Sequence, residues 1–78
     1  MNATGSQLKL IEDMLSTNQL YTGRYDRLWK RLEMARIAHQ ADAIGIERDG
    51  CHMSSDDADS IWAWLNRAHR AGTLRQWV

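Results

Sequence analysis

Apolar positions recur at helical spacing in three stretches of this chain. In the first stretch, three residues occupy one face at i, i+3 and i+7: Leu8, Ile11 and Leu15. Thr4 and Gln7 have the spacing of a capping box, in which each residue satisfies a backbone amide of the other. The pattern predicts a first helix from about residue 5 to residue 16, within a helical segment over residues 5–41, after a short flexible start over residues 1–4.

The second stretch is the longest and predicts a helix over about residues 23–41. Its N-terminal half places its apolar side chains on one face: Tyr21, Tyr25, Leu28, Trp29, Leu32 and Ala35. Its C-terminal half also carries apolar residues on the opposite side, among them Met34, Ile37 and Ala38. We therefore expect a central helix with another part of the chain packed on its far end.

The third stretch predicts a helix over about residues 56–71. Ser54 can cap its N-terminus, with Asp57 at the third helical position, and Gly72 is placed to end it in the left-handed conformation. Its apolar residues follow helical spacing: Ala58, Ile61, Trp62, Leu65 and Ala68. Residues 72–78 then form a tail, either extended or one helical turn.

Between the second and third stretches the apolar period changes from helical to alternating. Over residues 44–54, four apolar residues alternate with polar ones: Ile44, Ile46, Cys51 and Met53. Asp49-Gly50 lies between the two halves and favours a two-residue hairpin turn. In that register Glu47 faces His52, and the apolar residues share one face that packs on the helices. The predicted fold is α+β and mostly helical, in the order α-α-β-β-α, as a single domain of residues 1–78.

Composition limits the classes of partner. The chain has 78 residues and a formal net charge of zero, which argues against a polybasic nucleic-acid tail and a strongly acidic DNA mimic. A lone cysteine forms no internal disulfide and fits a reducing compartment. We see no secretory signal and no apolar run near the roughly 20 residues of a membrane span. These features predict a cytoplasmic protein that does not associate with membranes.

Candidate catalytic chemistry is sparse. Cys51 and His52 are adjacent, but neighbours on a strand point to opposite faces and would not form a nucleophile pair. The soft metal ligands lack the spacings of known zinc motifs: His39, Cys51, His52 and His69. The glycines stand alone rather than in a phosphate-binding loop. We therefore expect no enzyme activity, no cofactor and no metal site.

Charge is segregated along the chain although it balances overall. Three arginines align at i, i+3 and i+7 of the second helix: Arg24, Arg27 and Arg31. They form either a solvated face or a contact stripe for nucleic acid or an acidic protein surface. Three aspartates lie at the start of the third helix: Asp56, Asp57 and Asp59. They act either as caps that complement the helix dipole or as a negative binding patch.

Four tryptophans are unusual in so short a chain. Trp29 and Trp62 lie on predicted core faces, whereas Trp64 lies off the apolar stripe of its helix and Trp77 is next to the C-terminus. Tryptophan and arginine are the residue types that anchor protein interfaces. Trp64 and Trp77 are therefore candidate partner anchors, with packing at the edge of the core as the alternative. The partner can be another protein or a second copy of this chain, which would form a homodimer.

The string Met-Ser-Ser-Asp-Asp-Ala-Asp-Ser-Ile at residues 53–61 resembles a stretch of a small phage anti-CRISPR protein. The anti-CRISPR protein of this type is an acidic DNA mimic that blocks a type I surveillance complex. The resemblance implies a small inhibitor, in a bacterial host cell, with Asp56, Asp57 and Asp59 as the mimicking charges. Our leading hypothesis is a non-enzymatic inhibitor or adaptor that masks a surface of a larger bacterial nucleoprotein complex, such as a CRISPR effector.

A second resemblance supports an alternative. An Asp-Gly hairpin followed by an acidic-capped helix with Trp-x-Trp-Leu at residues 62–65 is similar to the wing and following helix of excisionase-type winged-helix proteins. This resemblance implies a small DNA-binding transcriptional regulator, with Arg24, Arg27 and Arg31 in the role of the recognition surface. A stripe of that size would give a weak, salt-sensitive contact with phosphates.

Overall fold

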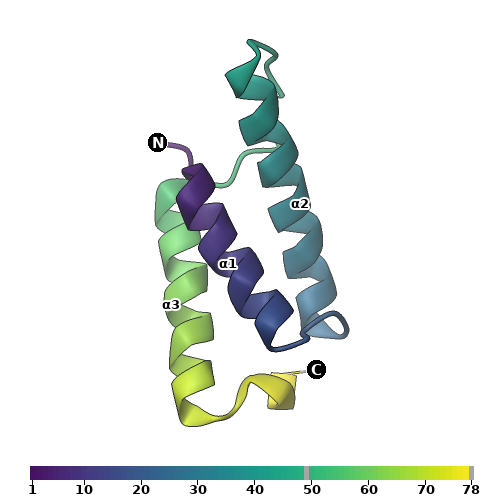
Figure 1. Cartoon of the computed structure of the whole chain (residues 1–78), viewed down its shortest axis with the longest axis vertical. Coiled ribbons are helices and arrows are strands. Elements are labelled where there is room, and N and C mark those ends of the chain that lie inside the picture. Colours follow the sequence, from purple (N-terminus) through teal and green to yellow (C-terminus); the bar gives the residue numbers. More distant parts are fainter. Residues whose placement is uncertain (49, 78) are drawn as a thin grey trace.

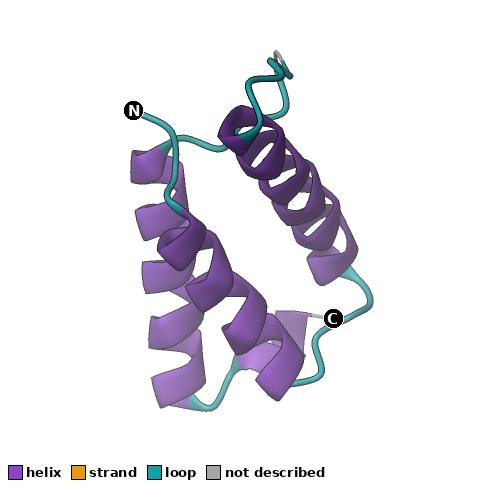
Figure 2. Cartoon of the chain, turned by 45° about the horizontal axis from the view of Figure 1, so that its top comes forward, coloured by secondary structure: helices purple, strands orange, loops and turns teal. Residues whose placement is uncertain are grey.

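The fold is a bundle of three α-helices followed by a short 3₁₀ turn. The computed structural model describes residues 1–48 and 50–77, with side chains up to residue 75. The elements of this part are α1 (Gly5–Thr17), α2 (Arg24–Ala43), α3 (Ser55–Ala71) and η1 (Leu74–Trp77). Helices α1 and α3 run in one direction and α2 runs in the other, with α1 lying between its two neighbours (Figures 1 and 2). The three helices predicted from the sequence are confirmed.

The core forms where the apolar faces of the helices meet. The fully buried large side chains come from all three helices: Tyr25, Ile11, Leu15, Leu32 and Leu65. Partly buried aromatic residues pack against this cluster, Trp29 from α2 and Trp62 and Trp64 from α3. The helical spacing of apolar residues therefore identified the core face of each helix.

The helix starts follow the capping chemistry predicted for α1 and α3. The hydroxyl of Thr4 accepts a hydrogen bond from the amide of Gln7, whose side chain accepts one from the amide of Thr4. Ser54 accepts from the amide of Asp57 at the start of α3. Gly23 at the start of α2 has no side chain to act as a cap, so that helix depends more on packing than on a local signal.

All three helices end in the same way. In each, a backbone amide donates to the helical carbonyl five residues before it. The residue directly before that amide is left-handed, as in a Schellman ending. The three donor amides belong to Leu20, Ile46 and Thr73. The left-handed residues are Gln19 with a φ of 56°, Gly45 with 79° and Gly72 with 71°. Gly72 therefore has the conformation that the sequence predicted for it.

The predicted β-hairpin over residues 44–54 is wrong, and with it the α+β class. No strand occurs among residues 1–48 and 50–77. The amides of Ile44 and Ile46 donate to the carbonyl of Ala41, and the amide of Gly45 donates to that of Asp42. These backbone donors thus complete the end of α2 and are not available for a strand ladder. A lone two-stranded hairpin is marginally stable in water, so the helix ending prevails.

A backbone hydrogen bond still closes the turn predicted within this segment, although no strands flank it. The amide of Cys51 donates to the carbonyl of Arg48 at 3.3 Å, and Gly50 has a φ of 78°. Asp49 of the predicted Asp-Gly turn lies outside the described residues. The loop projects beyond the end of the helices (Figures 1 and 2). The expected shared apolar face does not form, because Ile44 and Ile46 are 74% and 50% exposed while Met53 is buried.

The predicted cross-strand pair between Glu47 and His52 is replaced by another contact. Nε2 of His52 lies 3.3 Å from a carboxylate oxygen of Asp42, which ties the loop back to the last turn of α2. Cys51, expected to be buried, is a partly buried free cysteine.

The N-terminal segment, predicted to be a flexible start, lies against the residues that precede α3. The amide of Ala3 donates to the carbonyl of Met53, and the amide of Ser55 donates to that of Met1, each at 2.8 Å. Ala3 is buried as well. Two remote segments are thereby joined at the starts of α1 and α3. No helix in the described part of the chain is long and apolar enough to cross a membrane.

Candidate functional site

A surface groove of about 320 Å³ lies between α2 and α3. We call it the arginine groove because its lining includes Arg24, Arg27 and Arg31. The apolar side chains in its lining come from both helices: Tyr25, Leu28, Ile61 and Trp64. The three arginines are exposed, whereas Tyr25 and Leu28 are buried. The groove therefore combines an apolar floor with a rim of guanidinium groups.

The groove unites two sets of residues that the sequence predicted separately. The arginine row was expected on one face of α2, and Trp64 was expected as an anchor on α3. Ile61 and Trp64 are three residues apart on a helix and so share a face. That spacing is the signal that could have added Ile61 to the site, but nothing in the sequence alone indicated that this face would meet Leu28.

One arginine of the groove has an acidic neighbour on α3. Nη2 of Arg31 lies 3.7 Å from a carboxylate oxygen of Asp57, and both side chains are more than half exposed. Asp56 is exposed in the same first turn of α3. Because α2 and α3 run in opposite directions, Arg31 lies toward the start of α3, while Arg24 lies farther from it. Asp57 thus lies beside the end of the groove that Arg31 lines, whereas Arg24 lies toward the other end.

Asp59 contacts a different helix from Asp57. Its carboxylate accepts a hydrogen bond from Nε2 of Gln7 at 2.9 Å, and the same nitrogen donates to Oγ of Ser55 at 2.9 Å. Gln7 therefore links the capping box of α1 to the first turn of α3. The predicted three-aspartate patch is divided, with Asp59 facing α1 and Asp57 facing α2.

The structure describes the side chain of only one of the two candidate tryptophan anchors. Trp64 is partly buried and packs against the core, while it also lines the arginine groove. The two readings of Trp64, edge of the core and contact surface, therefore describe the same position. The backbone of Trp77 belongs to η1, but its side chain lies outside what the structure describes.

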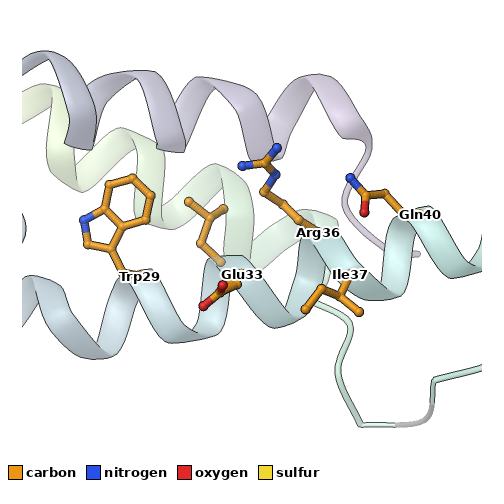
Figure 3. A pocket seen from close by; sticks show the side chains of 6 residues that line it. Trp29, Glu33, Arg36, Ile37 and Gln40 are labelled. Atoms are coloured by element: carbon orange, nitrogen blue, oxygen red, sulfur yellow. The ribbon is translucent and has the colours of Figure 1, made fainter.

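A second groove, of about 340 Å³, runs along another face of α2 (Figure 3). Arg36 in its lining points toward α1, whereas Ile37 points away from it (Figure 3). Nη1 of Arg36 lies 2.6 Å from a carboxylate oxygen of Glu12 on α1. Nε1 of Trp29 donates to the carbonyl of Leu20 at 2.6 Å, and its ring stacks on Tyr21. Arg36 and Trp29 of this groove thus make contacts within the chain, which makes the groove a weaker candidate for a binding site.

Tyr25 is a buried ionisable residue that lines the arginine groove. Burial raises the pKa of the Tyr25 phenol, and the charge of Arg24 offsets part of that rise. In the described part of the chain, no three side chains of the metal-ligating types gather at one place. His69, one of the four potential metal ligands considered from the sequence, is exposed.

Comparison with protein-family models, curated proteins and solved structures gives no match to this chain. The two sequence resemblances therefore remain hypotheses. The excisionase-like one loses its principal structural element, because the described residues between 44 and 54 include no strand of the hairpin that would be its wing. The arginine groove is therefore the candidate functional site of this chain.

Proposed function

We propose that this chain is a small protein-binding module, an inhibitor or adaptor that acts by covering a surface of a larger partner without catalysis. The observation that carries the proposal is the arginine groove, where a floor with Ile61 and Trp64 is bordered by three arginines. Arginine and tryptophan contribute most to the binding energy of protein interfaces. A groove that offers both suits a partner with an apolar side chain and nearby carboxylates.

Charge favours a protein partner over a nucleic acid. The chain has a net charge of zero, so it lacks the excess positive charge that draws a protein to a polyphosphate backbone. The carboxylate of Asp57 lies beside Arg31 at the rim and offsets part of the positive charge there. A guanidinium pairs with a carboxylate in a bidentate geometry, as it does with a phosphate, so carboxylates on a protein partner can satisfy this groove. The free thiol of Cys51 is consistent with the reducing cytoplasm of a bacterial cell. The resemblance at residues 53–61 makes a CRISPR effector complex one candidate target.

The experiment is affinity capture of the tagged protein from a bacterial lysate treated with nuclease. We expect a protein partner to be retained at a constant ratio by the wild type and lost with Arg27→Glu, which reverses one exposed charge of the groove. Arg48→Glu is the matched control, since it makes the same change of charge in the loop after α2. Equal recovery with both variants would place the contact elsewhere. A purified type I surveillance complex, offered directly, tests the anti-CRISPR version.

A DNA-binding regulator remains the second candidate because Arg24, Arg27 and Arg31 share one side of α2. In this case, duplex DNA should bind at low salt, and its affinity should fall steeply as salt is raised. Arg27→Glu should remove the binding, while Arg48→Glu should weaken it less. A fluorescence anisotropy titration that shows no binding at low salt would eliminate this candidate.

A further inference from the structure

The arginine groove holds a local excess of positive charge. Among the described residues, its lining includes three arginines and no acidic side chain. Asp26, the aspartate in the first turn of α2, has a carboxylate oxygen 3.4 Å from Nζ of Lys30, and neither of these two residues lines the groove. The groove is therefore basic in a chain whose net charge is zero.

Arg27 lies in the middle of the arginine row and is open to a partner. Its side chain is exposed, and it makes no hydrogen bond or ion pair with the part of the chain that the structure describes. Nη2 of Arg31 is 3.7 Å from a carboxylate oxygen of Asp57, which is too long for a hydrogen bond, so the guanidinium retains donors for another acceptor. Charge complementarity therefore selects an anionic partner at Arg27 and Arg31.

The spacing of the groove suits a helical partner. Its residues on α2 include a set at i, i+3, i+4 and i+7: Arg24, Arg27, Leu28 and Arg31. Side chains in such rows form the grooves that accept the ridge of another helix. The arginines are separated by about 4.5 and 6 Å along the helix axis, which are the rises over three and four helical residues. Carboxylates three and four residues apart on a partner helix match these separations, whereas same-face residues of a strand are about 6.8 Å apart.

The other wall of the groove is apolar. On α3 it consists of Ile61 and Trp64, which are only partly buried in the free chain and pack against the core on one side. Phosphates of a nucleic acid would satisfy the arginines, but they offer no aliphatic side chain to cover Ile61 and Trp64. An amphipathic protein segment supplies both the negative charges and the apolar surface.

We infer that the partner segment of the arginine groove is an amphipathic α-helix with acidic residues along one border of its apolar face. Its carboxylates pair with Arg27 and Arg31 over α2, and its apolar side chains pack on Ile61 and Trp64 of α3. Helices that dock in grooves bind through apolar side chains at i, i+3, i+4 and i+7. The inference rests on the proposed function, because it specifies the partner chemistry of the same groove.

The experiment begins with a selection of helical peptides displayed on phage. The peptides have roughly 18 residues, long enough to be helical alone, and one face is randomised. The library is depleted on Arg27→Glu and then selected on the wild-type protein. We expect the enriched peptides to carry Asp or Glu at spacings of three or four, next to Leu, Ile or Phe. No enrichment, or enriched peptides without acidic residues, would overturn the inference.

The most enriched peptide, labelled with fluorescein, is then titrated by fluorescence anisotropy. Its Kd should rise roughly five- to tenfold with Arg27→Glu, since an exposed attraction becomes a repulsion. The Kd should be nearly unchanged with Arg48→Glu, the matched control in the loop after α2. The same peptide with lysine at its acidic positions should bind Arg27→Glu better than the wild type. An equal Kd for Arg27→Glu and the wild type would contradict the inferred contact.

Circular dichroism provides the test of helical binding. The helix signal of the peptide should increase in the complex, and the protein variants alone should retain the helix signal of the wild type. A bound peptide that is extended would contradict the inference. The peptide with serine at its apolar positions should no longer bind, because Ile61 and Trp64 would remain uncovered, and undiminished binding would likewise contradict it.

Two comparisons separate this inference from its alternatives. Duplex DNA that binds more tightly than any enriched peptide, and is lost with Arg27→Glu, would assign the groove to nucleic acid and overturn the inference. If Arg27→Glu abolishes capture of a lysate protein but the enriched peptides are neutral or extended, the inference fails while the proposed function stands. If the peptides bind as expected but capture of the lysate protein is unaffected by Arg27→Glu, the proposed function fails at this groove while its preference for acidic helices stands.

Discussion

The phenol of Tyr25 donates a hydrogen bond to the backbone carbonyl of Leu74. Tyr25 is in the first turn of α2 and is fully buried, while Leu74 is the first residue of η1 and is 4% exposed. The contact joins the start of the second helix to the segment that follows the third. Tyr25 also lines the arginine groove, so this buried tyrosine lies at the junction between the groove and the core.

This contact predicts a loss of stability in alkali. Burial raises the pKa of Tyr25 above its ordinary value of 10.0, because the folded protein disfavours the phenolate. Below pH 10 the phenol is neutral in both states, so stability is unaffected. Above it the unfolded chain releases the proton while the folded chain retains it, and the free energy of unfolding falls as pH rises toward the folded pKa.

Replacement of Tyr25 by Phe tests this prediction. The variant should lose about 1 kcal/mol at neutral pH because the Leu74 carbonyl loses its donor. It should also show a smaller decline above pH 10 than the wild type. Urea unfolding followed by circular dichroism at several pH values measures both effects. Tyr21→Phe is the control, since Tyr21 is 55% exposed. An identical alkaline decline in Tyr25→Phe and the wild type would contradict the assignment.

The link between α1 and α3 at Gln7 gives a second prediction. Gln7→Glu retains an oxygen that accepts from the amide of Thr4, but it removes the nitrogen that donates to Asp59 and Ser55. A carboxylate then faces the carboxylate of Asp59. We expect a loss of roughly 1–2 kcal/mol from the missing hydrogen bonds and the repulsion.

A double-mutant cycle isolates the repulsive part. Adding Asp59→Asn to Gln7→Glu removes the like charge and supplies an amide donor, so part of the lost stability should return. Denaturant unfolding of the four proteins gives the coupling free energy. If the two substitutions add without coupling, the contact between α1 and α3 at this position contributes nothing.

A third prediction concerns the end of α1. Gln19 has a φ of 56°, a left-handed conformation that is costly for residues other than glycine. Gln19→Gly should raise the free energy of unfolding by up to about 1 kcal/mol. Gly45 is the matched control at the end of α2, with a φ of 79° and open space where a Cβ would lie. Gly45→Ala should lower stability by a similar amount, about 1 kcal/mol, through backbone strain alone. Thermal unfolding of both variants measures these opposite changes.

The fourth prediction tests the core. Leu65 is completely buried on α3, so Leu65→Ala should cost roughly 2–5 kcal/mol through lost burial and the remaining cavity. For so small a domain that loss is a large part of the total stability. Ile44→Ala is the control, because Ile44 is 74% exposed and its truncation should change stability by about 0.5 kcal/mol or less. Urea midpoints for both variants provide the comparison, and a similar loss at both positions would contradict this core.

Local sequence signals located the helices and most of their ends. Thr4 with Gln7, Ser54 with Asp57, and Gly72 are recognisable because each contact spans a few residues. Helical spacing likewise identified Leu15 and Leu65 as core residues. These features depend on neighbours along the chain, so they can be derived without knowing how the helices pack.

The segment after α2 shows where a prediction from local sequence patterns fails. Ile44 and Ile46 alternate as in a strand, yet Gly45 lies between them and ends the helix in the left-handed conformation. Both interpretations are compatible with the same residues. The choice depends on which backbone carbonyls the amides reach, and those of Ala41 and Asp42 are close by.

For the candidate site, too, local patterns predicted positions on one helix but not the contacts between helices. The sequence by itself determined that Arg24, Arg27 and Arg31 share one side of a helix, because helical periodicity fixes that side. Only the tertiary structure decided that Trp64 lies against this row and that Asp57 lies beside Arg31, while Asp59 turns to α1. The physical reason is that contacts between helices depend on how whole apolar faces pack together. That packing minimises exposed apolar area over all three helices at once, which no local pattern specifies.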